Sequence, residues 1–326
     1  MTIQATPMPS KLPTTISPMP TRWLTLAILL LLAFTARAQD PAPKLIAPGV
    51  WFLPGDAHKG DSNTIVIEMQ DTLLVVDGSY PGRAKELLQI IPTLSPKPIR
   101  YVFSTHAHGD HSYGNSVWNH AGIATLAAEG VDEEMDRYEP ARWQAALAKR
   151  DDVRALNEPF PARPTHVFRG RKMVIKDGAR EVDFLFLGWA HTRGDGFVWL
   201  PRERILCTGD AAVNGPRNKL WDADIANWPR VLDEAAKLRP VHVLPGHGPD
   251  GGAEILSAQA RFLRDLLAAV HDQVSAGKTL EQAQTEVHLP AADANWIPAD
   301  MSGDIEAAFR EVKEGKPMGA LPHTWR

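Results

Sequence analysis

The sequence contains a single cysteine, Cys207, among its 326 residues. Because there is no second thiol, no disulfide can form within the chain, and the fold must be stabilised by its core. The chain also lacks any run of basic residues, and its formal net charge is −4. This balance argues against nucleic acid as a partner. The remaining composition, 44% hydrophobic and 23% charged, is that of a globular protein long enough to bury a large core.

Long hydrophobic runs are also scarce, and the longest one lies near the N-terminus. It extends over residues 24–34, follows the basic residues Lys11 and Arg22, and precedes the small-residue pattern Ala36-Arg37-Ala38. These features are typical of a secretory signal peptide over residues 1–38, cleaved after Ala38. A membrane anchor would need about 20 apolar residues, so we expect a periplasmic or secreted protein that is free of the membrane after cleavage.

The first part of the mature chain is predicted to form strands separated by short loops and one helix. Strands are expected over residues 50–53, 64–67, 72–78 and 99–104. The run at 72–78 is continuously apolar, as in a strand that is buried on both faces. Residues 83–91 have helical spacing and are expected to stop before Pro92. The strand, helix, strand order predicts an α/β layered fold.

The rest of the chain divides into a mainly helical stretch, a second series of strands and a helical tail. Residues 115–160 are expected to be mainly helical. Further strands are expected over 167–168, 172–175, 182–187, 196–200, 204–207 and 241–244, and helices over 227–238, 253–271, 280–287 and 304–312. This order predicts one catalytic domain over residues 45–250, followed by a C-terminal helical extension over residues 251–326.

The densest group of potential metal ligands follows the strand expected at 99–104. The segment T-H-A-H-G-D-H at residues 105–111 contains four of them: His106, His108, Asp110 and His111. Transition metals bind imidazole and carboxylate ligands. Alternate residues of an extended segment point to the same side, so His106 and His108 can bind one ion. A turn at Gly109, where no side chain would crowd the metals, lets Asp110 and His111 face a second ion.

Three further candidates lie where later strands are expected to end. His191 follows the strand at 182–187, Asp210 follows the strand at 204–207, and His247 follows the strand at 241–244. Functional groups gather beyond one end of the strands in open α/β sheets, so we expect these side chains to converge. The alternatives are a histidine-rich surface loop at 105–111 and a turn-forming aspartate at Asp210.

These motifs, in this order over residues 45–250, resemble the metallo-β-lactamase superfamily. The resemblance implies an αββα sandwich, here with extra C-terminal helices, and two Zn²⁺ ions per chain at one edge of its sheets. It implies that His106, His108 and His191 hold the first ion and that Asp110, His111 and His247 hold the second, with Asp210 bridging them. It also implies that Asp77 orients a ligand histidine; an Asp-Gly turn is the alternative for this residue.

Two dications about 3.5–4 Å apart would supply a bridging hydroxide at neutral pH. The expected reaction is hydrolysis of an ester, thioester, lactone or amide, β-lactams included, with Asp110 relaying the proton. Within the family, an aspartate at the position of Asp210 resembles glyoxalase II and the broad hydrolase branch more than the β-lactam hydrolases. Arg193 replaces the usual proline after the third histidine motif, which would leave the ligand intact and place a cation near the site.

Two hypotheses other than zinc-dependent hydrolysis remain open, and iron or manganese are the alternative metals. One is an oxidoreductase similar to persulfide dioxygenases, whose single iron would leave the second ligand set unused. The other is a non-catalytic metal-binding protein. The expected partner is a small-molecule substrate, and the candidates for contacting it lie in a loop before the strand at 64–67 or just after the ligand motifs: His58, Tyr113, Asn214, Arg217, Lys219 and Trp221. The sequence leaves the substrate itself and the oligomeric state open.

Overall fold

The computed structural model describes residues 42–322. The expected signal peptide, residues 1–38, therefore lies outside the described residues. Among residues 42–322, no helix combines the length and the apolar character that crossing a membrane requires.

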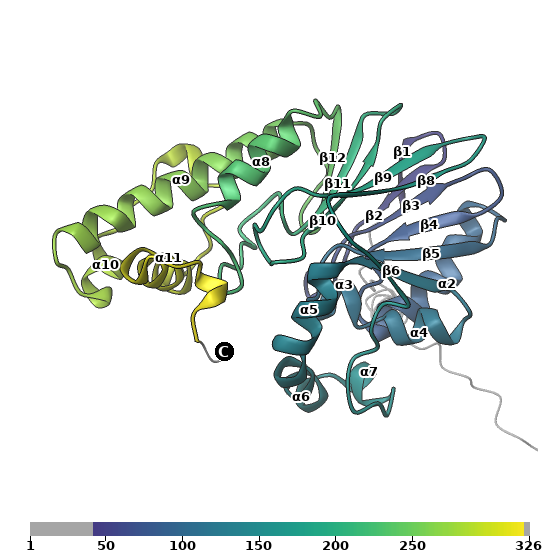
Figure 1. Cartoon of the computed structure of the whole chain (residues 1–326), viewed down its shortest axis with the longest axis horizontal. Coiled ribbons are helices and arrows are strands. Elements are labelled where there is room, and N and C mark those ends of the chain that lie inside the picture. Colours follow the sequence, from purple (N-terminus) through teal and green to yellow (C-terminus); the bar gives the residue numbers. More distant parts are fainter. Residues whose placement is uncertain (1–41, 323–326) are drawn as a thin grey trace, which may run out of the picture. The chain divides into compact units, whose positions relative to one another are not determined.

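Two β-sheets form the centre of the described chain (Figure 1). The first sheet has the strand order β1-β2-β3-β4-β5-β6-β7, with parallel pairing from β4 to β7 and antiparallel pairing elsewhere. Its strands are β1 (Lys44–Ala47), β2 (Val50–Leu53), β3 (Thr64–Glu68), β4 (Leu73–Val76), β5 (Ile99–Ser104), β6 (Ala124–Ala128) and β7 (His166–Phe168).

The second sheet has the order β12-β11-β10-β9-β8, and only its β11–β12 pair is parallel. Its strands are β8 (Lys172–Lys176), β9 (Glu181–Phe186), β10 (Gly196–Leu200), β11 (Ile205–Gly209) and β12 (His242–Pro245). The parallel pair matters for the site because it brings the carboxyl ends of β11 and β12 to one edge of the sheet.

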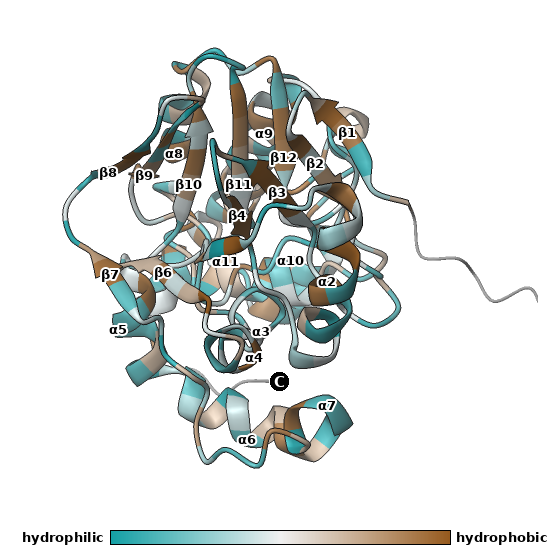
Figure 2. Ribbon diagram, turned by 90° about the vertical axis from the view of Figure 1, so that its right-hand side faces the viewer, coloured by the Kyte–Doolittle hydropathy of each residue, from teal (hydrophilic) through white to brown (hydrophobic). Residues whose placement is uncertain are grey.

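The alternation of side chains along each strand produces the layers. On β3, Ile65 and Ile67 belong to a core shared with residues of β9 to β12, whereas Val66 belongs to a different core on the other face of the sheet. Successive residues of a strand point to opposite faces, so the first core lies between the two sheets and the second beneath the helices. Figure 2 shows the hydrophobic colouring concentrated on strands such as β3 and β4.

Helices cover the outer face of each sheet (Figure 1). Trp118 and Leu87, from α4 and α2, pack on the first sheet, and Phe262 and Phe309, from α9 and α11, share a core with Trp199 of the second sheet. The helices are α2 (Pro81–Leu94), α3 (Gly109–Ser112), α4 (Asn115–His120), α5 (Glu129–Arg137), α6 (Glu139–Lys149), α7 (Asp151–Arg154), α8 (Trp228–Ala236), α9 (Glu254–Ser275), α10 (Leu280–Glu286) and α11 (Ser302–Glu314), with short 3₁₀ turns η1 (Ala291–Asp293) and η2 (Met318–Ala320).

The fold is therefore the predicted α/β sandwich with two sheets between helical layers, and helices α9 to α11 follow its last strand. The stretch 115–160 is mainly helical, as predicted, but strand β6 within it was missed. Its alanine-rich sequence favours a helix in isolation but pairs with β5 and β7 in the sheet. One local boundary was wrong. Helix α2 continues through Pro92 to Leu94, because a proline in the last turn costs less than one in the middle of a helix.

Candidate metal centre

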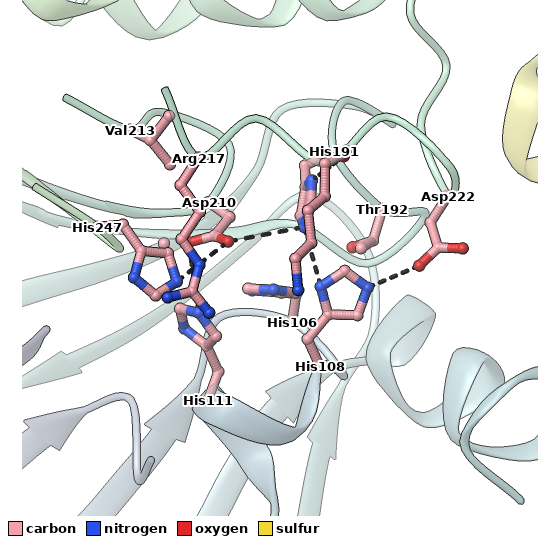
Figure 3. A network of polar contacts seen from close by, with 12 residues as sticks. His106, His108, His111, His191, Thr192, Asp210, Val213, Arg217, Asp222 and His247 are labelled. Atoms are coloured by element: carbon pink, nitrogen blue, oxygen red, sulfur yellow. Dashed lines mark hydrogen bonds and ion pairs between the residues drawn. The ribbon is translucent and has the colours of Figure 1, made fainter. Parts of the chain in front are cut away.

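Loops at the carboxyl ends of several strands meet at one edge of the two sheets and carry all seven predicted ligands, of which Figure 3 labels all but Asp110. His106 and His108 follow β5, and the short helix α3 carries Asp110 and His111. The other three follow strands of the second sheet. His191 lies in the loop between β9 and β10, Asp210 is the first residue after β11, and His247 lies in the loop after β12. All seven residues are buried.

These side chains form overlapping groups in which the potential ligand atoms all lie within 4.8 Å of one another. The groups are His106 with His108 and His191, His106 with His111 and Asp210, and Asp110 with His111 and His247. Asp210 lies between the first and third groups, because its carboxylate oxygens are 3.3 Å from His111 Nε2, 3.5 Å from His247 Nε2 and 3.8 Å from His191 Nε2.

The hydrogen bonds of His191 and His108 fix the direction of their lone pairs. His191 Nδ1 donates to the carbonyl oxygen of Lys219 at 2.9 Å, and His108 Nε2 lies 2.6 Å from Asp222 Oδ2. When both rings are neutral, as metal ligands must be, the remaining nitrogens His191 Nε2 and His108 Nδ1 both present lone pairs, and they lie 3.0 Å apart. Two lone pairs at this distance repel each other unless a cation lies between them, which fits a metal at this position.

Three further ring nitrogens, from both ligand sets, fit a metal for a related reason. His106 Nε2, His111 Nε2 and His247 Nε2 are buried and make no hydrogen bond of regular geometry within residues 42–322, although the last two lie 3.3 Å from Asp210 and 3.1 Å from Asp110, respectively. Buried polar atoms without a hydrogen bond are rare in folded proteins and call for an explanation. Here each of them lies where a metal ion bound by the neighbouring ligands would complete its contacts.

Several pKa shifts in the centre favour the protonation states that ligands need. Burial, helped by neighbouring histidines, lowers the pKa of His106 well below its ordinary value and lowers the pKa of His191 to about 3. Burial alone would raise the pKa of Asp110 and Asp210, but the charges of His111 and His247 lower both well below the usual range. Neutral imidazoles and ionised carboxylates are the forms that bind metals. His111 is the exception: burial alone would lower its pKa, but the carboxylates of Asp77, Asp210 and Asp110 raise it well above the ordinary value, so a metal ion would have to displace its proton.

Asp77 contacts one of the predicted ligands, as the family resemblance implied. Its Oδ2 lies 2.9 Å from His111 Nδ1, and its Oδ1 accepts a hydrogen bond from the backbone N–H of Thr105 at 2.8 Å. Asp77 adopts a φ of 66°, a conformation that aspartate tolerates better than most residues. The carboxylate thus orients His111 and holds the start of the 105–111 segment.

No pattern in the sequence predicted a second supporting carboxylate, Asp222. Besides His108, Asp222 Oδ2 accepts a hydrogen bond from Arg142 of α6. Arg142 Nη1 also pairs with Glu139 Oε1 at 2.5 Å, and Glu139 Oε2 accepts from the Tyr113 hydroxyl at 2.6 Å. A chain of buried polar contacts therefore connects α6 to a predicted ligand, through residues that are far apart in the sequence and form no motif.

The loop that carries Asp222 is braced by the C-terminal region. The backbone N–H of Gly319 donates to Ala223 O at 2.9 Å, and Glu311 of α11 accepts from the backbone N–H groups of Ile225 and Ala226. The C-terminal helices therefore support the metal centre as well as covering the second sheet.

The structure brings only some of the predicted substrate contacts to the site. Arg217 Nη2 lies 3.0 Å from Asp110 Oδ2, and Lys219, Trp221 and Tyr113 line a cavity beside it. His58 is exposed on its loop, and the same loop reaches the site through Ser62, whose hydroxyl donates to Asp110 O.

Two other residues singled out from the sequence make their contacts within the protein. Asn214 donates from its side chain to Pro249 O and from its backbone to His247 O, so it supports the His247 loop from outside. The guanidinium of Arg193 lies 3.3 Å from Glu134 and over the ring of Trp189, whose indole N–H donates to Asp222 O.

Glycine is required at two positions for reasons that only the structure reveals. A Cβ at Gly109 would lie 2.6 Å from the ring of Tyr113, so the packing of this tyrosine excludes a side chain at this position. Gly209, just before Asp210, has a φ of +50°, and its Cβ would lie 2.2 Å from Thr105 Oγ1. It allows the close approach of the β11 end to the 105–111 segment.

Comparison with known sequences identifies the family of the chain. The family model of the metallo-beta-lactamase superfamily matches residues 59–247, a range that includes the seven predicted ligands. A metallo-beta-lactamase type 2 from a Bacillus species (strain 170) is 27% identical over 201 residues, which cover 60% of this chain and 70% of that protein. A linear primary-alkylsulfatase from a Pseudomonas species is 23% identical over 293 residues, which cover 77% of this chain and 54% of the relative.

Solved structures share the fold. A metallo-beta-lactamase from Pontibacter korlensis superposes with a TM-score of 0.55 at 20% identity, covering 69% of this chain and 99% of that one. The DIM-1 metallo-beta-lactamase superposes with a TM-score of 0.56 at 19% identity, covering 68% of this chain and 96% of its own. At these identities the likeness extends to the architecture alone.

Proposed function

Because the chain belongs to the metallo-beta-lactamase superfamily, we propose that it is an exported hydrolase with two metal ions, cleaving an ester, thioester, lactone or amide. One observation carries this proposal: two complete sets of ligand atoms lie side by side, with Asp210 between them. A site for a single ion would need only one of these sets.

The predicted ligands have separate roles in this proposal. His106, His108 and His191 would hold one ion, Asp110, His111 and His247 the other, and Asp210 both. Two bound dications would acidify water and polarise a carbonyl group. Asp110 also lines the cavity beside the centre, so its carboxylate can accept the proton of the attacking water and return it to the leaving atom.

Zinc is the metal that we propose, because imidazole and carboxylate ligands in a compact site suit it. Iron and manganese use similar ligands, and an oxidoreductase with a single iron would use only part of the centre. The second set, Asp110, His111 and His247, is buried and grouped as closely as the first, which favours the hydrolase over that alternative.

The test combines metal analysis with a substrate panel. We expect the purified protein to bind two zinc ions per chain and to hydrolyse at least one class among esters, thioesters, lactones and β-lactams. Asp110→Ala should lower kcat by at least about a hundredfold, the size typical of lost acid–base catalysis. One iron per chain, or equal activity of wild type and Asp110→Ala on every responsive substrate, would refute the proposal.

Export is part of the proposal and is tested separately. It is supported by the apolar run at residues 24–34 and the Ala36-Arg37-Ala38 pattern. Expression of the full chain in a bacterial host should yield a periplasmic or secreted protein whose first residue is Gln39. Recovery of the uncleaved chain from the cytoplasm would contradict it.

A further inference from the structure

A cavity of about 450 Å³ lies beside the metal centre and shares part of its wall. His108, Gly109 and Asp110 line it on the side of the ligands, and helix α6 lines it through Ala145, Ala146 and Lys149. A substrate whose scissile bond reaches the ligands would therefore place the rest of its structure in this cavity.

Much of the cavity wall is apolar. The rings of Tyr80 and Tyr113 pack edge to face with centroids 6.0 Å apart, and Trp221 lines the cavity from the loop before α8. Ala145 and Ala146 present only methyl groups to it. Such a wall favours an aliphatic or aromatic group, because it is displaced from water on binding.

The charged residues of the wall are mainly basic, and most of them are already paired. Arg142 pairs with Glu139 and Asp222, and Arg150 pairs with Asp152. The two acidic residues of the wall, Asp110 and Asp222, contact His247 and His108 respectively.

Two lysines in the wall differ from these arginines. Lys149 ends α6, and Lys219 lies in the loop after Asp210; within residues 42–322 neither ammonium group has a carboxylate oxygen within 4.0 Å. Both side chains belong to exposed residues. Asp110 offsets part of the Lys219 charge, but the wall holds two arginines and two lysines against two acidic residues, so its charge is positive overall.

From this combination we infer that the enzyme selects substrates with an apolar body and an anionic group remote from the scissile bond, the anion being held by Lys149 and Lys219. This inference rests on the proposed hydrolase function and names the substrate class of the same site. A neutral substrate would leave both lysines without a partner, and a cationic one would be repelled by them.

The experiment compares two esters that differ only in the remote charge. In 4-nitrophenyl hexanoate the acyl chain ends in a methyl group, whereas in the mono-4-nitrophenyl ester of adipic acid it ends in a carboxylate. We expect the metal-loaded enzyme to prefer the adipate ester in kcat/KM. Lys149→Gln combined with Lys219→Gln should reduce this preference about tenfold, mainly through KM, as expected for two partly exposed charges.

Two further variants make the test specific. Lys85→Gln removes an exposed lysine of α2 that does not line the cavity, and it should leave the preference unchanged. Ala145→Glu keeps both lysines but adds a negative charge to the wall at an exposed helical position, and it should also lower the preference. An unchanged preference in the double lysine variant, or a wild-type enzyme that prefers the neutral ester, would overturn the inference.

A separate binding measurement distinguishes an incorrect anion site from an incorrect hydrolase function. Calorimetry with adipate and hexanoate requires no turnover, and both ligands offer one carboxylate to the metals. We expect adipate to bind more tightly, and this advantage should disappear in the double lysine variant. If no ester is hydrolysed but the adipate advantage is observed, hydrolysis is the wrong function and the anion site stands; if adipate and hexanoate bind equally, the anion site is wrong.

Discussion

Asp222 Oδ2 lies 2.6 Å from His108 Nε2 (Figure 3) and also accepts a hydrogen bond from the guanidinium of Arg142. The carboxylate fixes the His108 ring so that Nδ1 points toward His191. Arg142 comes from α6, which also lines the substrate cavity. The contacts of Asp222 therefore connect the orientation of His108 to α6, the helix that lines the cavity.

This contact predicts that Asp222→Ala weakens metal binding at the set formed by His106, His108 and His191. Without the carboxylate, the His108 ring can rotate or bind a proton at Nδ1, and loss of such a supporting partner typically costs about 10–100-fold in metal affinity. Titration against a competing chelator measures this affinity. Asp222→Asn, which retains an acceptor oxygen, should lose less, and wild-type affinity in Asp222→Ala would contradict the role assigned to this residue.

Local patterns were enough to predict most strands and the position of every candidate ligand. The ligands lie immediately after runs of apolar residues, and the layered fold brings such strand ends to one edge. The supporting network was not predictable, because Asp222, Arg142 and Glu139 meet only through the packing of α6 against a distant loop. Strand β6 was missed for a similar reason: its pairing on both sides overrides the helical tendency of its alanines.

Asp77→Asn should impair the second set of ligands, Asp110, His111 and His247. The amide can still accept from the Thr105 N–H through its oxygen, but its NH₂ group would then face His111 Nδ1. This arrangement favours the tautomer with hydrogen on Nε2, the nitrogen that faces Asp210, and a protonated nitrogen cannot bind a metal.

Metal content after dialysis measures the effect of Asp77→Asn, with circular dichroism as the check on folding. We expect the number of bound ions to fall from two toward one per chain while the secondary structure persists. Two tightly bound ions in the folded variant would show that Asp77 serves only the backbone turn.

Cys207→Ala should leave the metal content and the activity unchanged. Cys207 lies on β11 in the core between the sheets, fully buried among apolar side chains, and this burial raises the pKa of its thiol. The substitution should lower the free energy of unfolding by about 1 kcal/mol through lost packing. In the native enzyme the thiol should not react with a thiol-specific reagent until denaturant is added; rapid reaction, or loss of metal in the variant, would instead indicate a cysteine ligand.

Asp304→Asn should stabilise the protein at alkaline pH. Asp304 lies in the first turn of α11, its Oδ2 has no hydrogen-bond partner among the described residues, and burial, with a contribution from Asp300, raises its pKa to about 7. The folded protein thus binds this proton more tightly than the unfolded chain. The free energy of unfolding should therefore decrease as the pH rises from about 4 to about 7, and remain lower above that range.

An asparagine at position 304 removes this penalty, since it carries no charge at any of these pH values. The positive end of the α11 dipole favours the carboxylate and offsets part of the gain, so we expect a stabilisation of about 1–2 kcal/mol at pH 8 and almost none at pH 4. Urea unfolding of both proteins across this range measures the difference, with Asp272→Asn as an exposed control on α9. A difference that stays constant with pH would mean that Asp304 ionises in the folded protein as it does in the unfolded chain.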